Sequence, residues 1–505
     1  MPASNPEKTM KKYLLGTFLA LLFLPSQLIW GKTVVVYHTS DIHGYFNGFP
    51  ALSALVKKEK NPHLLVDSGD WFQGTPEGNL SKGANAITLM NAVGYNAAVV
   101  GNHDYDYSEN NLKELSAAAK FKMLGAVYSG GSPVNYTAPY EIVAVDGVRI
   151  ALVGVQSDRT KYTVAPANIA GLTFNNGVAE VTQRVAEVKK QSVNAVIVLA
   201  HSPTCEACAT GTPLSEWIPS HEDLTRGNLA MARAVKGDVA VIMGGHVHTV
   251  FPQGYYDSES GTLFVESGSK SSGVTRVQLE FDDTTGRFKG AKAQYMALSG
   301  LQEDTEIKTM LKAITDEVGG IMDKTIGEAA AAIPREGPTL DSPIANWVND
   351  AMKKFAGTQI ALINSTGLRN GFPRGKLTLR DVYQVLPFDN YLVTLDIPGE
   401  RLEALLKNTV TPERSKIQVS EGVTIRYSLS SDSASVTDIK VFFNGAPLDP
   451  NAVYSVATAD FYAGVITGAA NLHNTNVLVR DVLNREVKES SPITPPRSGR
   501  IELVK

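Results

Sequence analysis

Five short segments of the 505-residue chain combine carboxylates, imidazoles and an amide at intervals suited to binding metal ions. They are Ser40–Gly44 (SDIHG), Asp67–Asp70 (DSGD), Gly101–Asp106 (GNHDYD), Ala200–Ser202 (AHS) and Gly244–His248 (GGHVH), and they hold five of the nine histidines. Carboxylate oxygens and neutral imidazoles are common ligands of divalent metals, and an Asn oxygen adds a ligand without adding charge. Together they offer the roughly eight ligand contacts that two divalent ions need when positions remain open for water and substrate.

The spacing inside two of the segments suggests how the ligands are shared. In an extended segment alternate side chains point the same way, so we expect Asp41 and His43 to hold one ion together. His246 and His248 have the same spacing, although a bend at the end of a strand would direct them to different ions. A single pair of this kind is common without a metal. Five clusters in one chain favour the metal interpretation.

Each cluster directly follows an apolar run that predicts a buried strand. Six such runs alternate with helical stretches at Asn110–Lys120 and Val178–Gln191: Thr33–His38, His63–Val66, Ala97–Val100, Ile150–Val155, Ala195–Leu199 and Val239–Met243. Val, Ile and Leu without polar alternation indicate strands buried on both faces, and the alternation with helices predicts a layered α/β domain. Ligand sites in such sheets form at the carboxyl ends of the strands, which would bring the five clusters together.

The rest of the chain suggests a second domain after a connecting helix. Asp146-Gly147 predicts a hairpin turn, and alternating runs at Thr262–Glu266, Val274–Phe281 and Phe288–Tyr295 predict antiparallel strands that close the first unit. Apolar residues at helical spacing predict a helix over Glu303–Met322. We therefore expect a first domain over residues 32–300, a linker helix over 301–325 and a second domain over 326–505.

Composition and the amino-terminal pattern restrict the class of protein. The chain is 43% hydrophobic and 19% charged, and its 47 basic and 51 acidic residues give a formal charge of −4, so we expect no nucleic-acid polymer as partner. Lys11-Lys12, an apolar stretch from Tyr13 to Leu24 and a small residue at Gly31 predict a secretory signal over residues 1–31. The alternative is a membrane anchor, but about twelve apolar residues are too few to span a bilayer. We expect a periplasmic or secreted monomer without a membrane span.

Cys205 and Cys208 are the only cysteines, and two residues separate them in CEAC. This spacing allows a redox motif, half of a zinc site or a tight loop disulfide. Because no second pair exists to complete a zinc site of four cysteines and the expected compartment is oxidising, a disulfide is the preferred interpretation.

The motifs SDIHG, SGD, GNHD and GGHVH resemble those of the calcineurin-like metallophosphoesterases. More narrowly, the chain is similar to the exported bacterial 5′-nucleotidase / UDP-sugar hydrolase family. The resemblance implies an α/β fold in which an N-terminal four-layer α/β/β/α metallophosphoesterase sandwich precedes an α+β substrate-binding domain. It also implies that one ion is bound by Asp41, His43, Asp70 and His248, and that Asp70 bridges to a second ion bound by Asn102, His201 and His246.

The resemblance further assigns catalysis to a His-Asp dyad, His103 and Asp106. His103 would stabilise charge on the phosphoryl oxygens or the leaving group, with Asp106 orienting its ring. The family usually has Glu and Phe where this chain has Asp104 and Tyr105. Two cations of zinc, manganese, cobalt or iron would lower the pKa of a bound water, so we expect hydrolysis by metal-activated water without a covalent intermediate.

Three segments of the second domain also resemble the family. In Asn364–Arg369 (NSTGLR), Pro387–Asn390 (PFDN) and Asp460-Phe461, the resemblance implies that substrate is bound by Asn364, Arg369, Phe388, Asn390 and Phe461. Phe388 and Phe461 would enclose the base, and Arg369 would meet the phosphate. The chain departs from the family at Gly464–Gly468, where an Asp that contacts ribose is missing, and ahead of the helix near Ile344, where an expected arginine is out of register at Arg335.

The expected function is hydrolysis of nucleoside 5′-monophosphates, with nucleotide sugars as further substrates, for scavenging outside the cytoplasm. The altered segment Gly464–Gly468 motivates an alternative, a phosphatase or cyclic-nucleotide phosphodiesterase of broader or non-nucleotide range. An alternative of another class is an exported nucleotide-binding protein without catalysis. The complete ligand set and the His103–Asp106 pair favour an enzyme.

Overall fold

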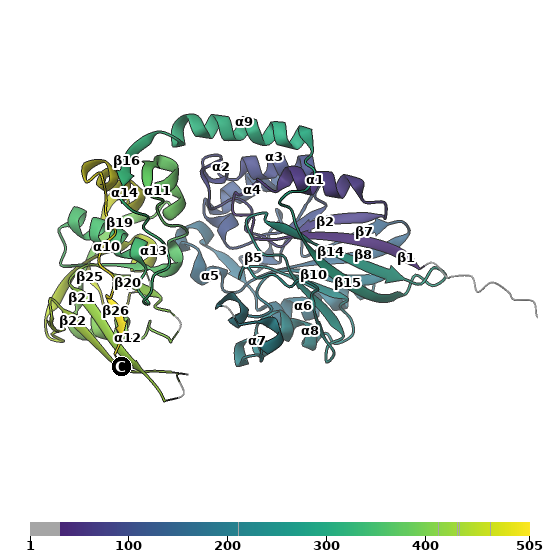
Figure 1. The fold of residues 1–505 in the computed structure, drawn as a ribbon. Helices are drawn as coiled ribbons and strands as arrows, with labels where there is room; N and C mark the ends of the chain where they lie inside the picture. Colours follow the sequence, from purple (N-terminus) through teal and green to yellow (C-terminus); the bar gives the residue numbers. More distant parts are fainter. Residues whose placement is uncertain are drawn as a thin grey trace, which may run out of the picture.

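The structure is a computed structural model that describes residues 31–210, 212–412, 414–431, 433, 435–464 and 466–504. The predicted secretory signal lies outside these residues except for Gly31. Figure 1 shows two lobes joined across one side by the long helix α9 (Thr305–Met322). No helix among the described residues has both the length and the apolarity needed to cross a bilayer.

Two six-stranded sheets form the centre of the first lobe. The first has the order β15 (Phe288–Ala297), β14 (Gly273–Phe281), β1 (Lys32–Thr39), β2 (His63–Asp67), β3 (Ala97–Val99) and β4 (Lys122–Leu124). The second has the order β12 (Tyr255–Asp257), β13 (Thr262–Glu266), β11 (Val241–Gly244), β10 (Ala195–His201), β8 (Val148–Gln156) and β7 (Tyr140–Val145). Within them, β1 to β4 are mutually parallel, as are β8, β10, β11 and β13.

Apolar side chains from both sheets meet in one core, so the sheets stack face to face. Val34 and Val36 of β1 and Ile197 and Leu199 of β10 belong to it, each with no exposed surface. The opposite face of the first sheet is covered by α1 (Phe49–Lys58), α3 (Ala84–Val93) and α4 (Ser108–Ala118), and that of the second by α6 (Gly177–Lys189) and α8 (Asn228–Ala234). The first lobe is therefore a four-layer α/β/β/α sandwich, as expected from the resemblance.

One expectation for the end of this lobe was wrong. Strands β14 and β15 pair antiparallel as predicted, and β14 continues antiparallel to β1. Strand β13, however, runs parallel to β11 and only its pairing with β12 is antiparallel. The reason is the chain path: the segment after β11 turns back through β12, so β13 enters the sheet in the direction of β11. Alternation of side chains does not report strand direction.

The second lobe is an α+β unit. Its main sheet has the order β20 (Ile417–Val419), β17 (Ile360–Asn364), β24 (Val453–Ala459), β19 (Tyr391–Pro398) and β25 (Ala470–Leu478). One face packs against α10 (Pro343–Ala356) and α14 (Val479–Glu489), and the other faces a core with α12 (Gly399–Lys407), β21 (Val423–Leu429), β22 (Val436–Phe443) and β26 (Ile501–Leu503). Helix α11 (Leu379–Val385) follows β18 (Gly375–Thr378) and lies on the side of the first lobe.

Candidate active site

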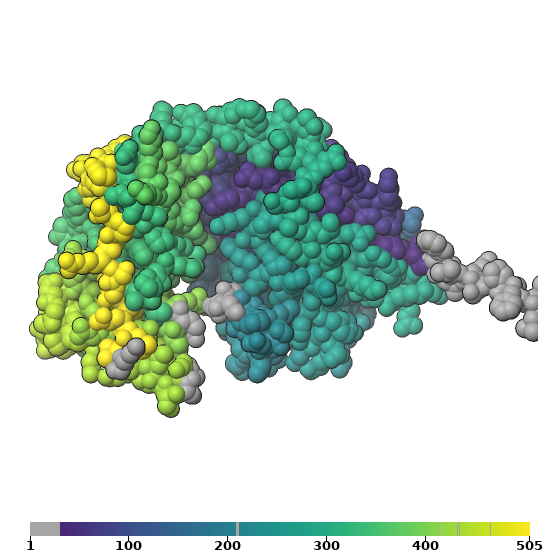
Figure 2. Space-filling view, viewed as in Figure 1, coloured from purple at the N-terminus to yellow at the C-terminus, as the bar shows by residue number. Residues whose placement is uncertain are grey.

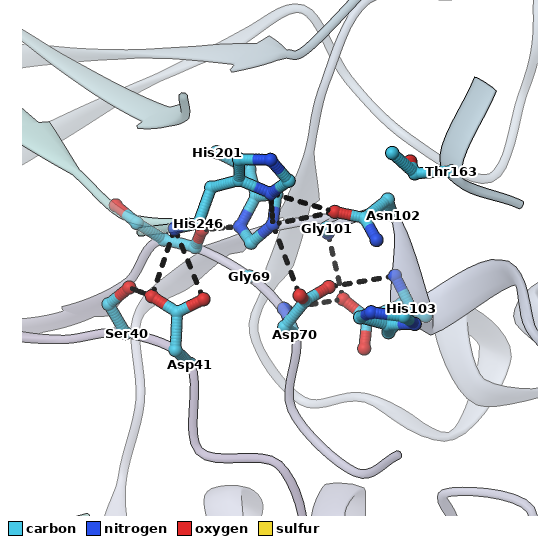
Figure 3. Close-up of polar contacts among 12 residues, drawn as sticks. Ser40, Asp41, Gly69, Asp70, Gly101, Asn102, His103, Thr163, His201 and His246 are labelled. Atoms are coloured by element: carbon cyan, nitrogen blue, oxygen red, sulfur yellow. Dashed lines mark hydrogen bonds and ion pairs between the residues drawn. The ribbon is translucent and has the colours of Figure 1, made fainter. Parts of the chain in front are cut away.

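The carboxyl ends of both sheets carry the polar clusters. The segments that contain Asp41, Asp70 and Asn102 follow β1, β2 and β3 directly, whereas His201 is the last residue of β10 and His246 follows β11. Because all five strands end at the same edge of the sandwich, side chains from segments over 200 residues apart converge there. Figure 3 shows Asp41, Asp70, Asn102, His201 and His246 pointing toward one another.

Most of the proposed ligands adopt an unusual backbone conformation. Left-handed φ values occur at Asp41 (53°), His43 (51°), Asp70 (61°), His246 (77°) and His248 (60°). Such values are rare outside glycine and cost roughly 1–2 kcal/mol per residue. The expectation that Asp41 and His43 lie in an extended segment was therefore wrong. Their side chains meet because the chain turns at each ligand, and strained residues of this kind cluster at functional sites.

One group of possible ligands consists of Asp41, His43 and His248. The Nε2 atoms of His43 and His248 lie 3.1 Å apart, and Nε2 of His248 lies 3.5 Å from Oδ1 of Asp41. Oδ2 of Asp70 lies 3.7 Å from Nε2 of His43. Asp70 thus stands beside this group as well as the second one.

The second group consists of Asp70, His201 and His246. Nε2 of His201 lies 3.2 Å from Oδ2 of Asp70 and 3.3 Å from Nδ1 of His246. Oδ1 of Asn102 lies 3.1 Å from Nε2 of His201 and 3.0 Å from Nδ1 of His246. His246 and His248 therefore belong to different groups, one of the two possibilities that their spacing left open.

The hydrogen bonds behind these groups indicate what they are built to hold. Nδ1 of His43 faces the carbonyl of Gln73 at 2.8 Å, and Nδ1 of His201 faces the carbonyl of Ser68 at 2.7 Å. These carbonyls accept the Nδ1 proton, so in the neutral rings Nε2 carries a lone pair directed into the site. Each group then brings lone pairs of nitrogen and oxygen face to face. A cation relieves that repulsion, so the residues present fit two metal ions.

The pKa shifts in the second group also indicate a site for a cation. Although burial alone lowers it, the pKa of His201 is raised to about 10 by Asp70 and Asp41. Burial and the neighbouring His201 lower the pKa of His246 to about 3. Burial works against a charged Asp70, but His201, His103 and His43 hold the pKa of its carboxyl well below the ordinary value. The carboxylates thus demand positive charge here, which a divalent ion supplies without protonating a ligand.

The predicted dyad lies beside Asp70. Nδ1 of His103 and Oδ2 of Asp106 are 2.8 Å apart, and the backbone N–H of His103 donates to Oδ1 of Asp70 over 2.8 Å. Burial acts against the charged ring, but Asp106 and Asp70 raise the pKa of His103. The backbone carbonyl of Asp106 accepts a hydrogen bond from Nδ2 of Asn168 over 2.8 Å, which fixes the turn that carries Asp106. The geometry suits an imidazole that donates a proton or a hydrogen bond from Nε2.

Sequence reasoning missed the contribution of Asp104. This fully buried carboxylate accepts the backbone N–H groups of Asp70 (3.0 Å), Trp71 (2.9 Å) and Gly101 (2.8 Å). Burial and the charge of Asp70 raise its pKa to about 7. Asp104 thereby fixes the loop that carries the shared ligand to the turn that carries His103. Its position beside His103, where an acidic residue is also usual in the family, was the available signal.

The second lobe brings two predicted substrate residues to the dyad. Nη2 of Arg369 lies 3.1 Å from Nε2 of His103, and the Phe388 ring centroid lies 5.4 Å from that of His103. The Arg369 guanidinium carbon is 5.3 Å from the centroid of Phe388. The lobes are joined here by the carbonyl of Pro387, which accepts from Nδ2 of Asn79 over 2.9 Å. Away from these contacts an open notch separates the lobes on the lower side of Figure 2.

Strand register explains where the other three substrate residues lie. Leu392 of β19 pairs with Ala459 of antiparallel β24, so Asn390, two residues before, and Phe461, two residues after, leave the sheet at the same end. Because β17 is parallel to β24, Asn364 at its end lies at that edge too. No contact between the rings of Phe388 and Phe461 is present among the described residues.

The two cysteines form a disulfide in the structure, between Cys205 and Cys208. The bridge closes the loop that follows β10, four residues after the proposed ligand His201. Neighbouring Glu206 forms an ion pair with Arg159. The disulfide thus belongs to the surroundings of the metal groups and not to their ligand sets.

Two protein families match separate parts of the chain. The family described as calcineurin-like phosphoesterase matches residues 34–250, and the family described as 5′-nucleotidase, C-terminal domain, matches residues 322–471. The first match contains the two groups of possible metal ligands and the His103–Asp106 pair. The second contains all five predicted substrate residues.

Individual proteins are similar over nearly the whole chain. Protein UshA of Yersinia enterocolitica is 24% identical, with 94% of this chain and 95% of that protein covered. Endonuclease YhcR of Bacillus subtilis is 25% identical over 85% of this chain, and this chain spans only 35% of the length of that relative. A crystal structure of a 5′-nucleotidase precursor from Thermus thermophilus superposes with a TM-score of 0.77 at 27% identity, covering 94% of this chain and 99% of the other.

Proposed function

Because the chain belongs to the 5′-nucleotidase family of calcineurin-like metallophosphoesterases, we propose that it hydrolyses nucleoside 5′-monophosphates to nucleoside and phosphate with two divalent metal ions. The chain is accordingly a metallophosphoesterase, a hydrolase. The proposal of nucleotide hydrolysis with two metal ions rests on one observation. Two groups of lone-pair donors stand on either side of Asp70, beside a His-Asp pair that the second lobe reaches with a guanidinium and an aromatic ring.

The proposed ligands divide into two sets that share one carboxylate. Asp41, His43 and His248 with Asp70 would hold one ion, and Asn102, His201 and His246 with Asp70 the other. Ions bound there supply positive charge for the phosphoryl oxygens and a water of lowered pKa. The ligand types suit zinc, manganese, cobalt and iron alike.

The chain's own residues supply orientation and proton transfer. Asp106 accepts from Nδ1 of His103 and so directs Nε2 toward the place where the phosphate ester binds. From there Nε2 stabilises charge that develops on a phosphoryl oxygen or on the leaving oxygen. Arg369, on the opposite side, presents its N–H donors to the same place.

The nucleoside would be held by the second lobe. Phe388 supplies a ring for stacking on the base, an interaction of roughly 1–3 kcal/mol. Asn390, Asn364 and Phe461 share the same sheet edge and would line the nucleoside side of the cleft.

We also propose that the protein acts outside the cytoplasm as a monomer, for nucleotide scavenging. The proposal is supported by the cationic start and apolar centre in the first 31 residues and by the Cys205–Cys208 disulfide, which persists in oxidising compartments. Comparing the mass of the protein from an exported fraction with that of the full-length chain tests the cleavage.

A broader phosphatase or cyclic phosphodiesterase remains the second candidate, because no Asp occupies the ribose-contacting position near Thr467. A panel of AMP, UDP-glucose, 2′,3′-cyclic AMP and glucose 6-phosphate separates the candidates. We expect the highest kcat/KM with AMP. An equal or higher kcat/KM with glucose 6-phosphate contradicts the nucleotide proposal.

His103→Ala separates an enzyme from a nucleotide-binding protein. We expect turnover to fall by at least 100-fold, the lower end of what acid-base groups contribute, while the metal content stays at the wild-type level. His63→Ala is the matched control, since His63 begins β2 at the end of the strand opposite the site. Unchanged turnover in His103→Ala refutes the assigned role.

A further inference from the structure

One arginine of the second lobe holds the loop that carries Phe388. The loop, residues 386–390, connects α11 to β19, and Arg480 is the second residue of α14, which lies beside α11 (Figure 1). Nη1 of Arg480 donates to the carbonyl of Phe388 over 3.3 Å and to that of Leu386 over 3.5 Å. Its Nη2 donates to Oδ1 of Asp389, with which it forms an ion pair. The guanidinium thus contacts the loop before, at and after Phe388.

Arg480 can support the loop because its own position is fixed. Its side chain is only 12% exposed, and the guanidinium carbon lies 4.0 Å from the centroid of the Tyr383 ring. A guanidinium stacked on an aromatic face and shielded from water keeps its donors in one direction. The next arginine of the helix, Arg485, is exposed and pairs instead with Glu489. The support of the loop is therefore specific to Arg480.

The carboxylate of Asp389 also reaches the first lobe. Its Oδ2 accepts from the hydroxyl of Tyr107 over 3.1 Å, while its Oδ1 accepts from Arg480. Tyr107 directly follows Asp106 of the predicted dyad. Each oxygen of this carboxylate thus has a donor from a different lobe. The loop that carries Phe388 is thereby tied to the turn that carries the dyad.

The Phe388 ring stands where a small shift of the loop changes what it can bind. Its centroid lies 5.4 Å from that of His103 and 5.3 Å from the guanidinium carbon of Arg369. A nucleotide whose base stacks on this ring has to place its phosphate at His103 at the same time. The distance from the ring to the imidazole therefore has to match the length of the nucleotide, and a misplacement of about 1 Å can cost on the order of 100-fold in rate.

We propose that Asp389, held by Arg480, is a positioning residue that sets the distance between the Phe388 ring and the dyad through its hydrogen bond with Tyr107. The inference rests on the proposed function, because it takes Phe388 as the ring that stacks on the base. Arg480 fixes the loop within its own lobe, and Tyr107 fixes it against the other lobe. Both act through the loop and need no contact with substrate, so the effect should be confined to substrates that carry a base.

The test measures kcat/KM of Asp389→Ala, Tyr107→Phe and Arg480→Gln with AMP and with glucose 6-phosphate, which has no base. We expect kcat/KM for AMP to fall at least fivefold in each variant, because each loses a hydrogen bond that involves a charged group. The value for glucose 6-phosphate should stay within twofold of wild type. An equal fall for both substrates refutes the positioning role, and so does an unchanged value for AMP in all three variants.

The first lobe contains a matched arrangement that serves as a control. The hydroxyl of Tyr128 donates to Glu180 over 2.7 Å, and Arg184 pairs with the same carboxylate, all within one lobe. Tyr128→Phe and, on α14, Arg485→Gln should leave kcat/KM for AMP within twofold of wild type. A loss in these controls as large as in the test variants would mean that the effect is not specific to Asp389 and would contradict the proposal.

A double-mutant cycle shows whether Tyr107 acts through Asp389. Added to Asp389→Ala, the change Tyr107→Phe should have almost no further effect on kcat/KM for AMP, because its hydrogen-bond partner is already gone. Multiplied losses in the double variant refute the link between the two residues. Tyr107→Phe also removes only a hydroxyl, so it tests the proposal even if Arg480→Gln fails to fold.

A measurement without substrate separates this inference from the proposed function. Amide hydrogen exchange of residues 386–390, followed by mass spectrometry, should be at least fivefold faster in Tyr107→Phe than in wild type and unchanged in Tyr128→Phe. A wild-type protein that prefers glucose 6-phosphate to AMP would refute the proposed function and leave this comparison intact. Equal exchange in Tyr107→Phe and wild type would overturn the role of Asp389, whichever substrate the protein prefers.

Discussion

Nη2 of Arg369 lies 3.1 Å from Nε2 of His103, so the second lobe touches the proposed catalytic imidazole directly. A guanidinium only donates, which makes Nε2 the acceptor and places the ring proton on Nδ1, facing Asp106. The two groups thus contact each other where a phosphoryl oxygen has to bind. A bound phosphate ester would accept from Arg369 and, once Nε2 of His103 takes up a proton, from His103 as well, which couples substrate binding to the distance between the lobes.

Removing the guanidinium tests this relationship. Arg369→Ala should lower kcat/KM for AMP roughly 100-fold, the cost of losing one donor aimed at developing charge, with unchanged metal content. Arg369→Lys should recover only part of the loss, because an ammonium lacks the forked donors. The exposed Arg374 is the control, and its change to Ala should stay within threefold. A wild-type kcat/KM in Arg369→Ala would show that the contact with His103 is incidental.

Asp104 should matter for metal affinity although it is no ligand. In Asp104→Asn an amide N–H2 replaces one acceptor oxygen and leaves a buried backbone N–H without a partner, at about 1–3 kcal/mol. We expect a lower unfolding temperature and at least tenfold weaker metal binding, measured by competition with a chelator. Asp283→Asn, at an exposed hairpin, should change neither. Full metal affinity in Asp104→Asn would contradict the positioning role.

Phe388 should act on nucleotides and not on phosphate esters in general. Phe388→Ala should raise KM for AMP about tenfold, consistent with loss of one stacking interaction, and leave the constants for glucose 6-phosphate within threefold. Phe388→Trp should restore the KM for AMP because it restores the ring. If Phe388→Ala raises KM equally for AMP and for glucose 6-phosphate, the ring serves the packing around His103 and Arg369 and does not bind the base.

Glu59 should make the stability of the first lobe sensitive to acid. Although burial alone raises it, hydrogen bonds from Asn61, Arg276 and Tyr37 lower the pKa of Glu59 to about 2. A carboxyl with a depressed folded-state pKa stabilises the fold fully above its unfolded value, near 4.3, and loses that contribution as the pH falls toward 2. Glu59→Gln should therefore cost about 1–2 kcal/mol at pH 7 after allowance for solvent screening.

The measurement is the thermal unfolding midpoint of wild type and Glu59→Gln at several pH values. The difference between them should be largest above pH 5 and shrink toward pH 2. A difference that stays constant from pH 7 to pH 2.5 would mean that packing, and not the charge of Glu59, accounts for the effect. Activity should not change, because Glu59 lies at the end of α1, away from the site.

Much of the first lobe could be predicted because its signals are local. Uninterrupted Val, Ile and Leu runs mark strands buried on both faces, and β1, β2, β8 and β10 lie where those runs do. The convergence of the five polar clusters could also be predicted, because ligand sites form at the carboxyl ends of the strands in such sheets. The direction of β13 could not be predicted in this way, because it depends on the path of the chain through β12 and not on the side chains of β13.

Local signals were less informative about the site itself. The left-handed turns at Asp41 and His43 bring both side chains to one place, whereas spacing alone suggested an extended segment. Contacts between lobes, such as Arg369 with His103, depend on how two domains dock, and no pattern within either domain encodes that.

The metal content of the protein tests the central claim most directly. Purified, chelator-treated protein should lose activity, and titration with zinc, manganese or cobalt should restore it with a break at two ions per chain. Asp70→Asn should weaken both ions together, because Oδ2 of Asp70 lies close to ligand nitrogens of both groups, His43 in the first and His201 in the second. Asp41→Asn should weaken one ion first, because Asp41 belongs to the first group. A protein that keeps full activity after exhaustive chelation, with less than one ion per chain by elemental analysis, would contradict the account.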